Sequence, residues 1–416
     1  MILLKNVTIV NEGSSLHLKK RDLLIKNGKI HQIASNLTNE DAQVISKENL
    51  HVSIGWMDSS VCFGEPGFEE RQTLKNGIDT AAKSGFTTIM LNPNNQPNPQ
   101  DASGINYLKG KASNEAVTVL PVGNFTINQE GEHLAELYDM QKAGAISFYD
   151  FKKSINNTNL LKVGLQYVKS FGGIIQSYPQ DNHLAGKGMV NEDDTTIHLG
   201  LKNTPAIAEE VQIARDIQVA AYTGARLHIP TITTAASVLL IKEAKKKYSN
   251  ITCSVSTNHL FLNTSSLTDF NTHSKIQPPL RDEKNRNALL SGLKNGVIDT
   301  VTSDHIPLNV EHKAVEFDQA SYGSIGLEST YGVLQNLLHT EKTIQALTSS
   351  YEVFGKEKPQ IKVGEIANLS LFVPDEKYTF EKEHIISSSK NSAVLGKKLV
   401  GRAYGIINNK KLVWNG

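Results

Sequence analysis

The residues of this chain that could do chemistry begin at the end of an apolar run, in the stretch Asp58-Ser59-Ser60-Val61-Cys62. The turn sequence Gly64-Glu65-Pro66-Gly67 follows it directly. Because side chains alternate along a strand, Ser60 and Cys62 project on the same side. As a thiolate, Cys62 could bind a metal ion or act as a nucleophile, and a small buried thiol is the alternative. We expect this stretch to line the mouth of a pocket.

The first 55 residues predict a small antiparallel sheet. Asn27-Gly28 separates two β-like runs and is a strong signal for a two-residue hairpin. From about Gly364 the chain returns to β-like runs, and we expect both ends to share one sheet. The predicted domains are therefore a β-rich domain made of residues 1–55 and 364–416, and a larger domain over residues 56–363.

The larger domain alternates strands of four to six residues with helices. This rhythm predicts parallel βαβ units, and about eight repeats predict a closed (β/α)8 barrel, with a doubly wound sheet as the alternative. In each predicted pair the helix comes first and the strand second. The pairs are 73–84 and 87–91, 102–111 and 117–122, 132–143 and 145–148, 159–171 and 173–176, 206–223 and 226–229, 235–248 and 251–256, and 285–295 and 300–302.

The composition of the chain argues against nucleic-acid binding, a disulfide framework and a membrane span. Lys and Arg number 43 against 42 Asp and Glu, so no strong field attracts nucleic acid. Cys62 and Cys253 are far apart and indicate neither a disulfide framework nor a thiolate zinc site. No run of eighteen apolar residues could cross a membrane, and Met1 to Val10 reads as a strand and not as a signal. We expect a cytoplasmic protein.

Several segments spread along the chain resemble the dihydroorotases of the amidohydrolase superfamily. Residues 58–67 are similar to the family signature Asp-x-His-x-His-x-Arg-Glu-Pro-Gly, and residues 85–97 to Gly-Gly-x-Thr-x-x-x-x-Met-Pro-Asn-Thr-x-Pro. The other similar segments are 144–148, 189–192, 208–216, 223–229, 275–281, 302–307 and 326–328. The resemblance implies an α/β fold, a TIM barrel of the amidohydrolase type with a small β-sandwich domain formed by the N- and C-terminal segments. It also implies zinc-dependent hydrolysis of a cyclic amide, in which the metal activates water.

The resemblance places this chain's residues at the family's ligand positions. The degenerate metal-site positions are Ser60, Cys62, Asp150, Tyr178, Thr231 and Asp304. Only Asp150 and Asp304 keep a ligating carboxylate there, and Asp304 matches the family's catalytic Asp. Gly64 stands where the family has a substrate-clamping Arg. Asn94 and Gln277 stand at substrate-contacting positions.

Each retained group also has a structural interpretation. Asp150 at a strand end could satisfy loop amides, and Asp304 could be a hydrogen-bonded carboxylate in the barrel mouth. His228 and His259 also stand near strand ends, where a structural role is the more common one. Since two carboxylates do not hold zinc with the selectivity of a histidine-rich site, no metal or other cofactor is expected.

These residues support three hypotheses. The leading one is a catalytically inactive dihydroorotase-like paralogue of pyrimidine biosynthesis, with a structural or regulatory role as a partner of aspartate transcarbamoylase. The second is an active dihydroorotase or related cyclic-amide hydrolase that uses zinc, Cys62, Asp150, Asp304 and histidines whose place the sequence leaves open. The third is a binding module for a small ureide. A homodimer is the expected assembly, because it is the commonest arrangement for such barrels.

Overall fold

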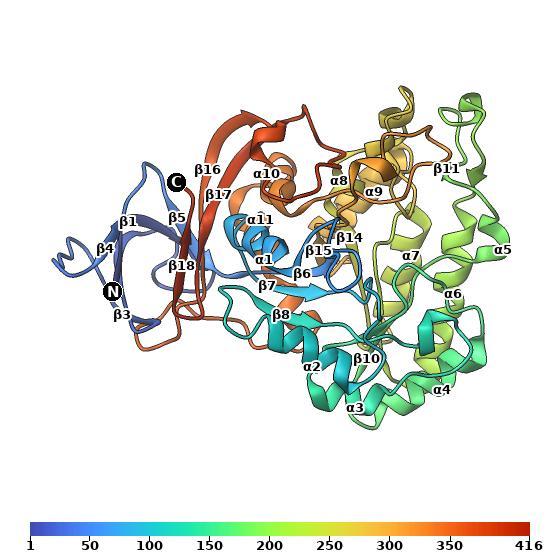
Figure 1. Cartoon of the computed structure of the whole chain (residues 1–416), viewed down its shortest axis with the longest axis horizontal. Helices are drawn as coiled ribbons and strands as arrows, with labels where there is room; N and C mark the ends of the chain where they lie inside the picture. The colour runs from blue at the N-terminus through green and yellow to red at the C-terminus, as the bar shows by residue number, and fades with distance from the viewer.

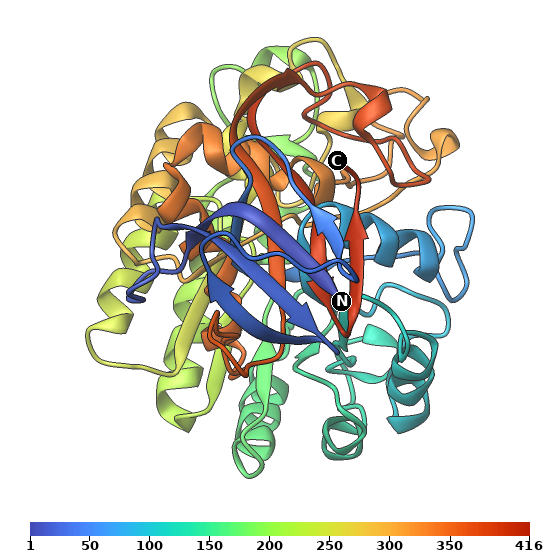
Figure 2. The ribbon, with the colours of Figure 1, turned by 90° about the vertical axis from the view of Figure 1, so that its left-hand side faces the viewer.

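The computed structural model describes residues 1–416, which form a barrel and a β-rich lobe at its side (Figure 1). Both chain termini lie in the lobe, at the left of Figure 1 and facing the viewer in Figure 2. The strands of the barrel lie on the opposite side of β16 (Leu369–Thr379) and β17 (Lys398–Asn408) from the N-terminal strands (Figure 1). The helices surround the barrel strands.

Eight strands form the barrel, and every pairing between them is parallel. Their bounds are β6 (Trp56–Val61), β7 (Phe86–Leu91), β8 (Thr118–Pro121), β9 (Phe148–Tyr149), β10 (Ile174–Gln176), β13 (Arg226–Ile229), β14 (Ile251–Ser256) and β15 (Thr300–Thr302). They pair in the orders β6-β7-β8 and β9-β10-β13-β14-β15. Single bridges from Gly123 to Phe148 and from Val61 to His305 join the two sets. The sheet is therefore closed, which confirms the barrel and excludes the doubly wound alternative.

The helices alternate with these strands largely as predicted. Their bounds are α1 (Leu74–Lys83), α2 (Ala102–Lys111), α3 (Leu137–Ala143), α4 (Thr158–Lys169), α5 (Asn182–Ala185), α6 (Ile207–Thr223), α7 (Ala235–Lys245), α8 (Thr257–Phe261), α9 (Glu283–Lys294), α10 (Leu327–Leu337), α11 (Thr340–Thr348) and α12 (Ser350–Val353). Short 3-10 turns are η1 (Ile127–Gln129), η2 (Ile197–Leu199), η3 (Thr264–Leu267), η4 (Thr272–Ser274), η5 (Val310–His312) and η6 (Lys382–His384). Thr73, Asp101 and Asp282 cap α1, α2 and α9 by accepting backbone N–H bonds.

One helix prediction is wrong at its start. The segment 132–143 was expected to be helical throughout, but α3 begins at Leu137. Leu134 forms an antiparallel bridge with Thr126, and the Ala135 N–H donates to the Phe125 carbonyl at 3.0 Å. These pairings use backbone groups that a longer helix would need, so the local propensity is overridden.

The strands of the two chain ends pair in one eight-stranded sheet. Their bounds are β1 (Ile2–Val10), β2 (Lys20–Lys26), β3 (Lys29–Ala34), β4 (Gln43–Ile45), β5 (His51–Ile54), β16 (Leu369–Thr379), β17 (Lys398–Asn408) and β18 (Lys411–Trp414). The order is β18-β17-β16-β5-β1-β2-β3, with β4 on β1. A two-stranded ladder of β11 (Val190–Asn191) and β12 (Asn203–Thr204) lies apart from it. The hairpin at Asn27-Gly28 is confirmed, and both residues have the positive φ that such a turn requires.

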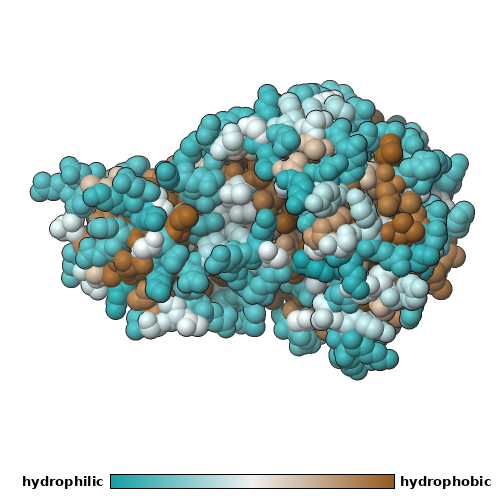
Figure 3. All heavy atoms as spheres, turned by 90° about the horizontal axis from the view of Figure 1, so that it is seen from below, coloured by the Kyte–Doolittle hydropathy of each residue, from teal (hydrophilic) through white to brown (hydrophobic).

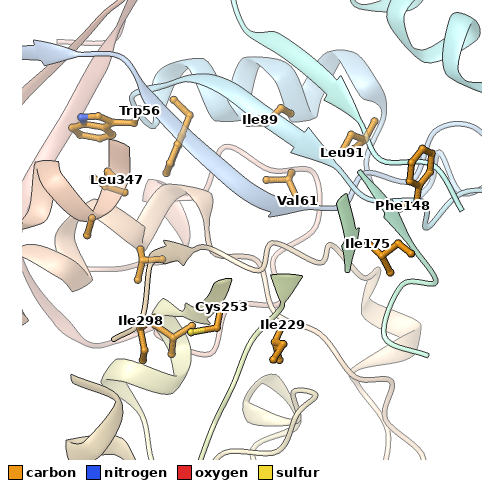
Figure 4. Packing of buried hydrophobic residues seen from close by; sticks show 14 of the residues in the cluster. Trp56, Val61, Ile89, Leu91, Phe148, Ile175, Ile229, Cys253, Ile298 and Leu347 are labelled. Atoms are coloured by element: carbon orange, nitrogen blue, oxygen red, sulfur yellow. The ribbon is translucent and has the colours of Figure 1, made fainter. Parts of the chain in front are cut away.

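The largest apolar cluster contains 53 buried residues and extends from the barrel to the shared sheet. Figure 4 shows Trp56 and Leu347 at one side of this cluster and Phe148 at the other. The Trp56 ring stacks on Tyr331 with centroids 4.9 Å apart and also contacts Phe372 of β16. Such aromatic pairs add about 0.5–1.5 kcal/mol beyond the burial of their area. Trp56 therefore fixes the start of β6 against both parts of the molecule.

The surface is mostly hydrophilic, and hydrophobic side chains form separate patches on the face drawn in Figure 3. The sheet forms the narrower lobe at the left of that view. None of the helices has both the length and the apolar character needed to cross a membrane.

Candidate site at the carboxyl ends of the barrel strands

Asp58 joins the first and last strands of the barrel. Its carboxylate accepts hydrogen bonds from the Ser60 N–H at 3.0 Å, the Ser303 N–H at 2.9 Å and the Thr302 hydroxyl. Burial raises the pKa of this carboxyl, and these donors oppose the shift. Because all of the donors lie on β6 and on β15 and its continuation, Asp58 holds the barrel closed and brings Ser60 toward Asp304.

Lys152 and Asp304 form the central contact of the site. The Lys152 ammonium donates to Asp304 Oδ2 at 2.6 Å and also to the backbone carbonyl of Gln277. The Lys152 side chain is 10% exposed and that of Asp304 is 5% exposed. The other carboxylate oxygen, Oδ1, accepts from the Ser60 hydroxyl at 3.2 Å. The Lys152 ammonium therefore occupies Asp304 Oδ2, an oxygen that would need a free lone pair to bind a metal ion.

Both residues of this contact have an unfavourable backbone conformation. Lys152 and Asp304 have φ values of 54° and 49°, in the left-handed region that non-glycine residues rarely adopt. Each such residue costs on the order of 1 kcal/mol, so the surrounding structure must hold both in place. The sequence identified Asp304 but gave Lys152 no role. The signal available was its position two residues after Asp150, just beyond β9.

Asp150 is turned away from this contact. Its carboxylate accepts from the Phe125 N–H at 3.0 Å, the Thr126 N–H at 2.9 Å and the Thr126 hydroxyl at 2.5 Å. Burial raises its pKa, and the three donors oppose that shift. Asp150 is thus the buried acceptor for the loop after β8, which is the structural interpretation given above.

Cys62 lies beside the central contact and is only 1% exposed. Burial raises the pKa of its thiol well above the ordinary value, and the negative charge of Asp304 raises it further. The side chains of Asn92 and Asn94 also face the thiol, and the Asn92 amide lies 3.8 Å from Sγ. A thiol in these surroundings stays protonated at neutral pH. It is therefore neither a ready nucleophile nor a ready thiolate ligand.

His228 and His259 are both buried and fully hydrogen-bonded. His228 Nδ1 lies 2.9 Å from the Thr252 hydroxyl, and its Nε2 lies 3.1 Å from the Ser254 hydroxyl. His259 is held in the same way by the Ser256 hydroxyl at 2.7 Å and the Pro278 carbonyl at 2.9 Å. Burial lowers the pKa of His228 to about 3 and that of His259 to about 4. Both rings are neutral members of the barrel interior.

Tyr178 and Thr231 supply no imidazole at the remaining two positions. Tyr178 is 1% exposed, and its hydroxyl has no hydrogen-bond partner. Burial raises the pKa of this hydroxyl well above 10. The Thr231 N–H donates to the Ser254 hydroxyl at 3.2 Å, and its φ of 53° continues β13 into a turn. Neither side chain is a useful neutral zinc ligand.

The three positions at which substrate contacts were expected have different surroundings in the structure. Asn94 lies beside Cys62, and Gln277 reaches the site through its backbone carbonyl. Gly64 is packed so tightly that a Cβ atom there would lie 1.7 Å from the Phe68 carbonyl oxygen. Its own N–H and carbonyl bond to Gln72 and Phe68, both at 2.8 Å. The loop is therefore built around glycine and has no room for an arginine.

These donors do not fit a zinc ion. Zinc sites in proteins need three or four His, Cys or carboxylate ligands that converge on one point. No group of three or more such side chains converges anywhere in the chain. Asp150 is already saturated by loop donors, and Asp304 is paired with Lys152.

Comparison with known proteins gives the family context. A family described as "Dihydro-orotase-like" matches residues 51–237. Proteins named dihydroorotase from Caldicellulosiruptor saccharolyticus and Pelotomaculum thermopropionicum are 36% and 32% identical to this chain, each over 99% of the chain and 98% of the relative. Among solved structures, an L-hydantoinase (dihydropyrimidinase) from Arthrobacter aurescens superposes with a TM-score of 0.85 at 21% identity. That match covers 100% of this chain and 96% of the other. It supports the fold.

Proposed function

The chain belongs to the dihydroorotase family, and from this premise we propose that it is a non-catalytic member whose barrel has a structural or regulatory role. The observation that carries the proposal is the ion pair of Lys152 with Asp304, 2.6 Å long and largely buried. An ammonium at this distance neutralises the one carboxylate in the strand-end cluster that could bind metal or move a proton.

The remaining site residues support the same proposal. Activation of water requires either a metal ion or a general base with a pKa near the working pH. The buried histidines have pKa values of about 3 to 4, and the Cys62 thiol is shifted in the opposite direction. The Asp150 carboxylate is directed to the loop after β8. No group other than Asp304 is placed to act as a base.

A hydrolysis assay tests the proposal. We expect no release of N-carbamoyl-aspartate from dihydroorotate above the buffer rate, with or without added zinc, and no reverse reaction. The relative from Caldicellulosiruptor saccharolyticus, assayed under the same conditions, serves as the positive control. Turnover by this chain that disappears in an Asp304→Asn variant would overturn the proposal.

We further propose that the barrel acts in pyrimidine synthesis by assembling with aspartate transcarbamoylase. The relatives named dihydroorotase support the place in pyrimidine synthesis, and an intact fold around a site without converging metal ligands supports a structural role. A mixture of the two proteins from one organism is expected to elute from a sizing column earlier than either alone. Unchanged elution at micromolar concentration would remove the partner. The homodimer and the cytoplasmic location remain predictions.

A second candidate, binding of a small ureide, is favoured by a specific feature. The Tyr178 hydroxyl and Asn92 Oδ1 are buried at the strand ends without hydrogen-bond partners. A buried polar atom without a partner costs about 1–3 kcal/mol, and a polar ligand could supply that partner. Dihydroorotate or N-carbamoyl-aspartate is then expected to raise the melting temperature of the wild-type protein but not of a Tyr178→Phe variant. Equal shifts in both proteins would exclude this role for Tyr178.

A further inference from the structure

A pocket lies between loops that follow barrel strands, and its lining residue Leu308 packs in the same small apolar cluster as Cys62. Its volume is about 510 Å³, within the range of small-molecule sites. Its walls include His273 of η4, residues 308–311 and 313–314 around η5, Lys382 of η6 and residues 388–391. The loops that follow β15 and η6 lie together at the upper right of Figure 2.

Asn391 fixes these two loops to each other. Its amide nitrogen donates to the Ile306 carbonyl at 2.9 Å, and its amide oxygen accepts from the Leu308 N–H at 3.0 Å. Both side-chain bonds are buried. The wall of the pocket is therefore held by buried hydrogen bonds and is not a chance meeting of surface loops.

The pocket carries positive charge that the protein leaves unpaired. Three lysines line it, Lys313, Lys382 and Lys390, and none of them forms a salt bridge. The acidic lining residues are Glu70 and Glu311, and Glu70 already lies 3.7 Å from Arg71 Nε. The lysines therefore outnumber the carboxylates that could neutralise them.

Lys313 shows this excess most clearly. It is 3% exposed, and its ammonium donates to the carbonyls of Thr272 and Ser321, both at 2.8 Å. Burial and the charge of Lys275 lower its pKa to about 7. A negatively charged ligand would offset both effects. Lys313 is therefore fully charged only below about pH 7, and a bound anion would favour its charged form.

His273 and Lys382 have donors left for a ligand. His273 Nδ1 is buried and has no hydrogen-bond partner. Burial lowers the pKa of the His273 ring, and the charges of Lys313 and Lys382 lower it further; all three side chains line the pocket. The Lys382 ammonium makes no hydrogen bond to the protein, and Lys390 uses two of its three N–H groups on backbone carbonyls. His273, Lys382 and Lys390 all line the pocket and keep polar groups that the protein leaves without partners.

We propose that this pocket binds a phosphate-bearing small molecule, with its phosphate held by Lys382, His273 and the free N–H of Lys390. Lysine binds phosphate as a point charge, and a phosphate has enough acceptor oxygens for all three donors. The position agrees with a general property of these barrels, in which loops after the seventh and eighth strands often hold phosphate. His273 follows β14 and Lys313 follows β15, the seventh and eighth barrel strands.

Calorimetric titration of the full chain with inorganic pyrophosphate, at constant ionic strength, tests the proposal. We expect saturable binding by the wild-type protein, weakened at least about tenfold in Lys382→Met, because a charge-assisted hydrogen bond is lost. Lys382 is exposed, so this variant is expected to fold normally. The matched control is Lys356→Met, which removes an exposed lysine outside the pocket and should bind like the wild type.

Two further measurements test the role of His273 and the preference for phosphate over a carboxylate. A His273→Phe variant should also bind pyrophosphate more weakly, and succinate should bind the wild type at least about tenfold more weakly than pyrophosphate does. The absence of saturable binding at millimolar pyrophosphate would overturn the proposal, as would equal affinity in Lys382→Met and Lys356→Met. Equal affinity for succinate would overturn the choice of phosphate. The proposal does not depend on whether the strand-end site is catalytic.

Discussion

Lys152 places a cation that is fixed to the chain beside Asp304. Its ammonium neutralises Asp304 and also binds the Gln277 carbonyl, so one side chain joins the loops that follow β9, β14 and β15. The sequence could predict that Ser60, Tyr178 and Thr231 are poor ligands, because that depends on side-chain chemistry alone. It could not predict the role of Lys152, because a contact across 152 positions depends on how the loops fold back.

A Lys152→Met variant tests the importance of this pair. Leaving a buried carboxylate without its partner is expected to lower the free energy of unfolding by about 3 kcal/mol. Adding Asp304→Asn should restore part of the loss, because the uncompensated charge is removed. Urea denaturation measures both changes, with Lys356→Met, at an exposed lysine, as the control that is expected within about 0.5 kcal/mol of the wild type. A loss no larger than that of the control would mean that the pair is not important for stability.

The buried histidines predict a pH dependence of stability. The folded-state pKa of His228 is about 3, below the ordinary value of 6.5. Between these values the unfolded chain binds a proton that the folded chain does not, so His228 lowers the free energy of unfolding as the pH falls. The contribution of this ring is about 1.4 kcal/mol per pH unit. A His228→Gln variant should therefore show a shallower decline between about pH 6 and 4 in chemical denaturation. Parallel curves for the two proteins would contradict the buried, neutral ring.

Among the secondary-structure elements, the turn after β6 shows how close packing of the backbone determines the shape of a loop beside the site. Glycine at position 64 allows the Phe68 carbonyl to approach the backbone and form the loop over residues 64–72. Sequence patterns predicted the strands and helices on either side, because periodicity and capping residues are local signals. They did not predict the start of α3, where bridging to Thr126 replaces the first helical turn, nor α10 to α12, for which no helix was expected.

Two glycine variants separate close packing from helix propensity. Gly64→Ala is expected to lower the free energy of unfolding by about 1–3 kcal/mol, because the added methyl meets a backbone carbonyl. In Gly110→Ala, at an open position in α2, the methyl meets nothing within 4 Å, and stability should rise by up to about 1 kcal/mol. Thermal melts of the two variants are expected to move in opposite directions. A Gly64→Ala melt that matches the wild type would show that the loop is not built around glycine.

At the scale of the whole molecule, the barrel could be predicted because eight strand–helix repeats leave few other closed arrangements. The pairing of both chain ends in one sheet follows from the same β-like runs. Closure itself depends on contacts between distant positions, such as Asp58 with Ser303, which no local pattern reports.

The claim that the strand-end site binds no zinc is tested most directly by the zinc content of the protein. The full chain is expressed with added zinc, purified without chelator and measured by mass spectrometry. We predict well below one zinc per chain, unchanged in Asp304→Asn, because Lys152 occupies the one available carboxylate and no other ligands converge there. About one or more zinc ions per chain, lost in the Asp304→Asn variant, would contradict the account.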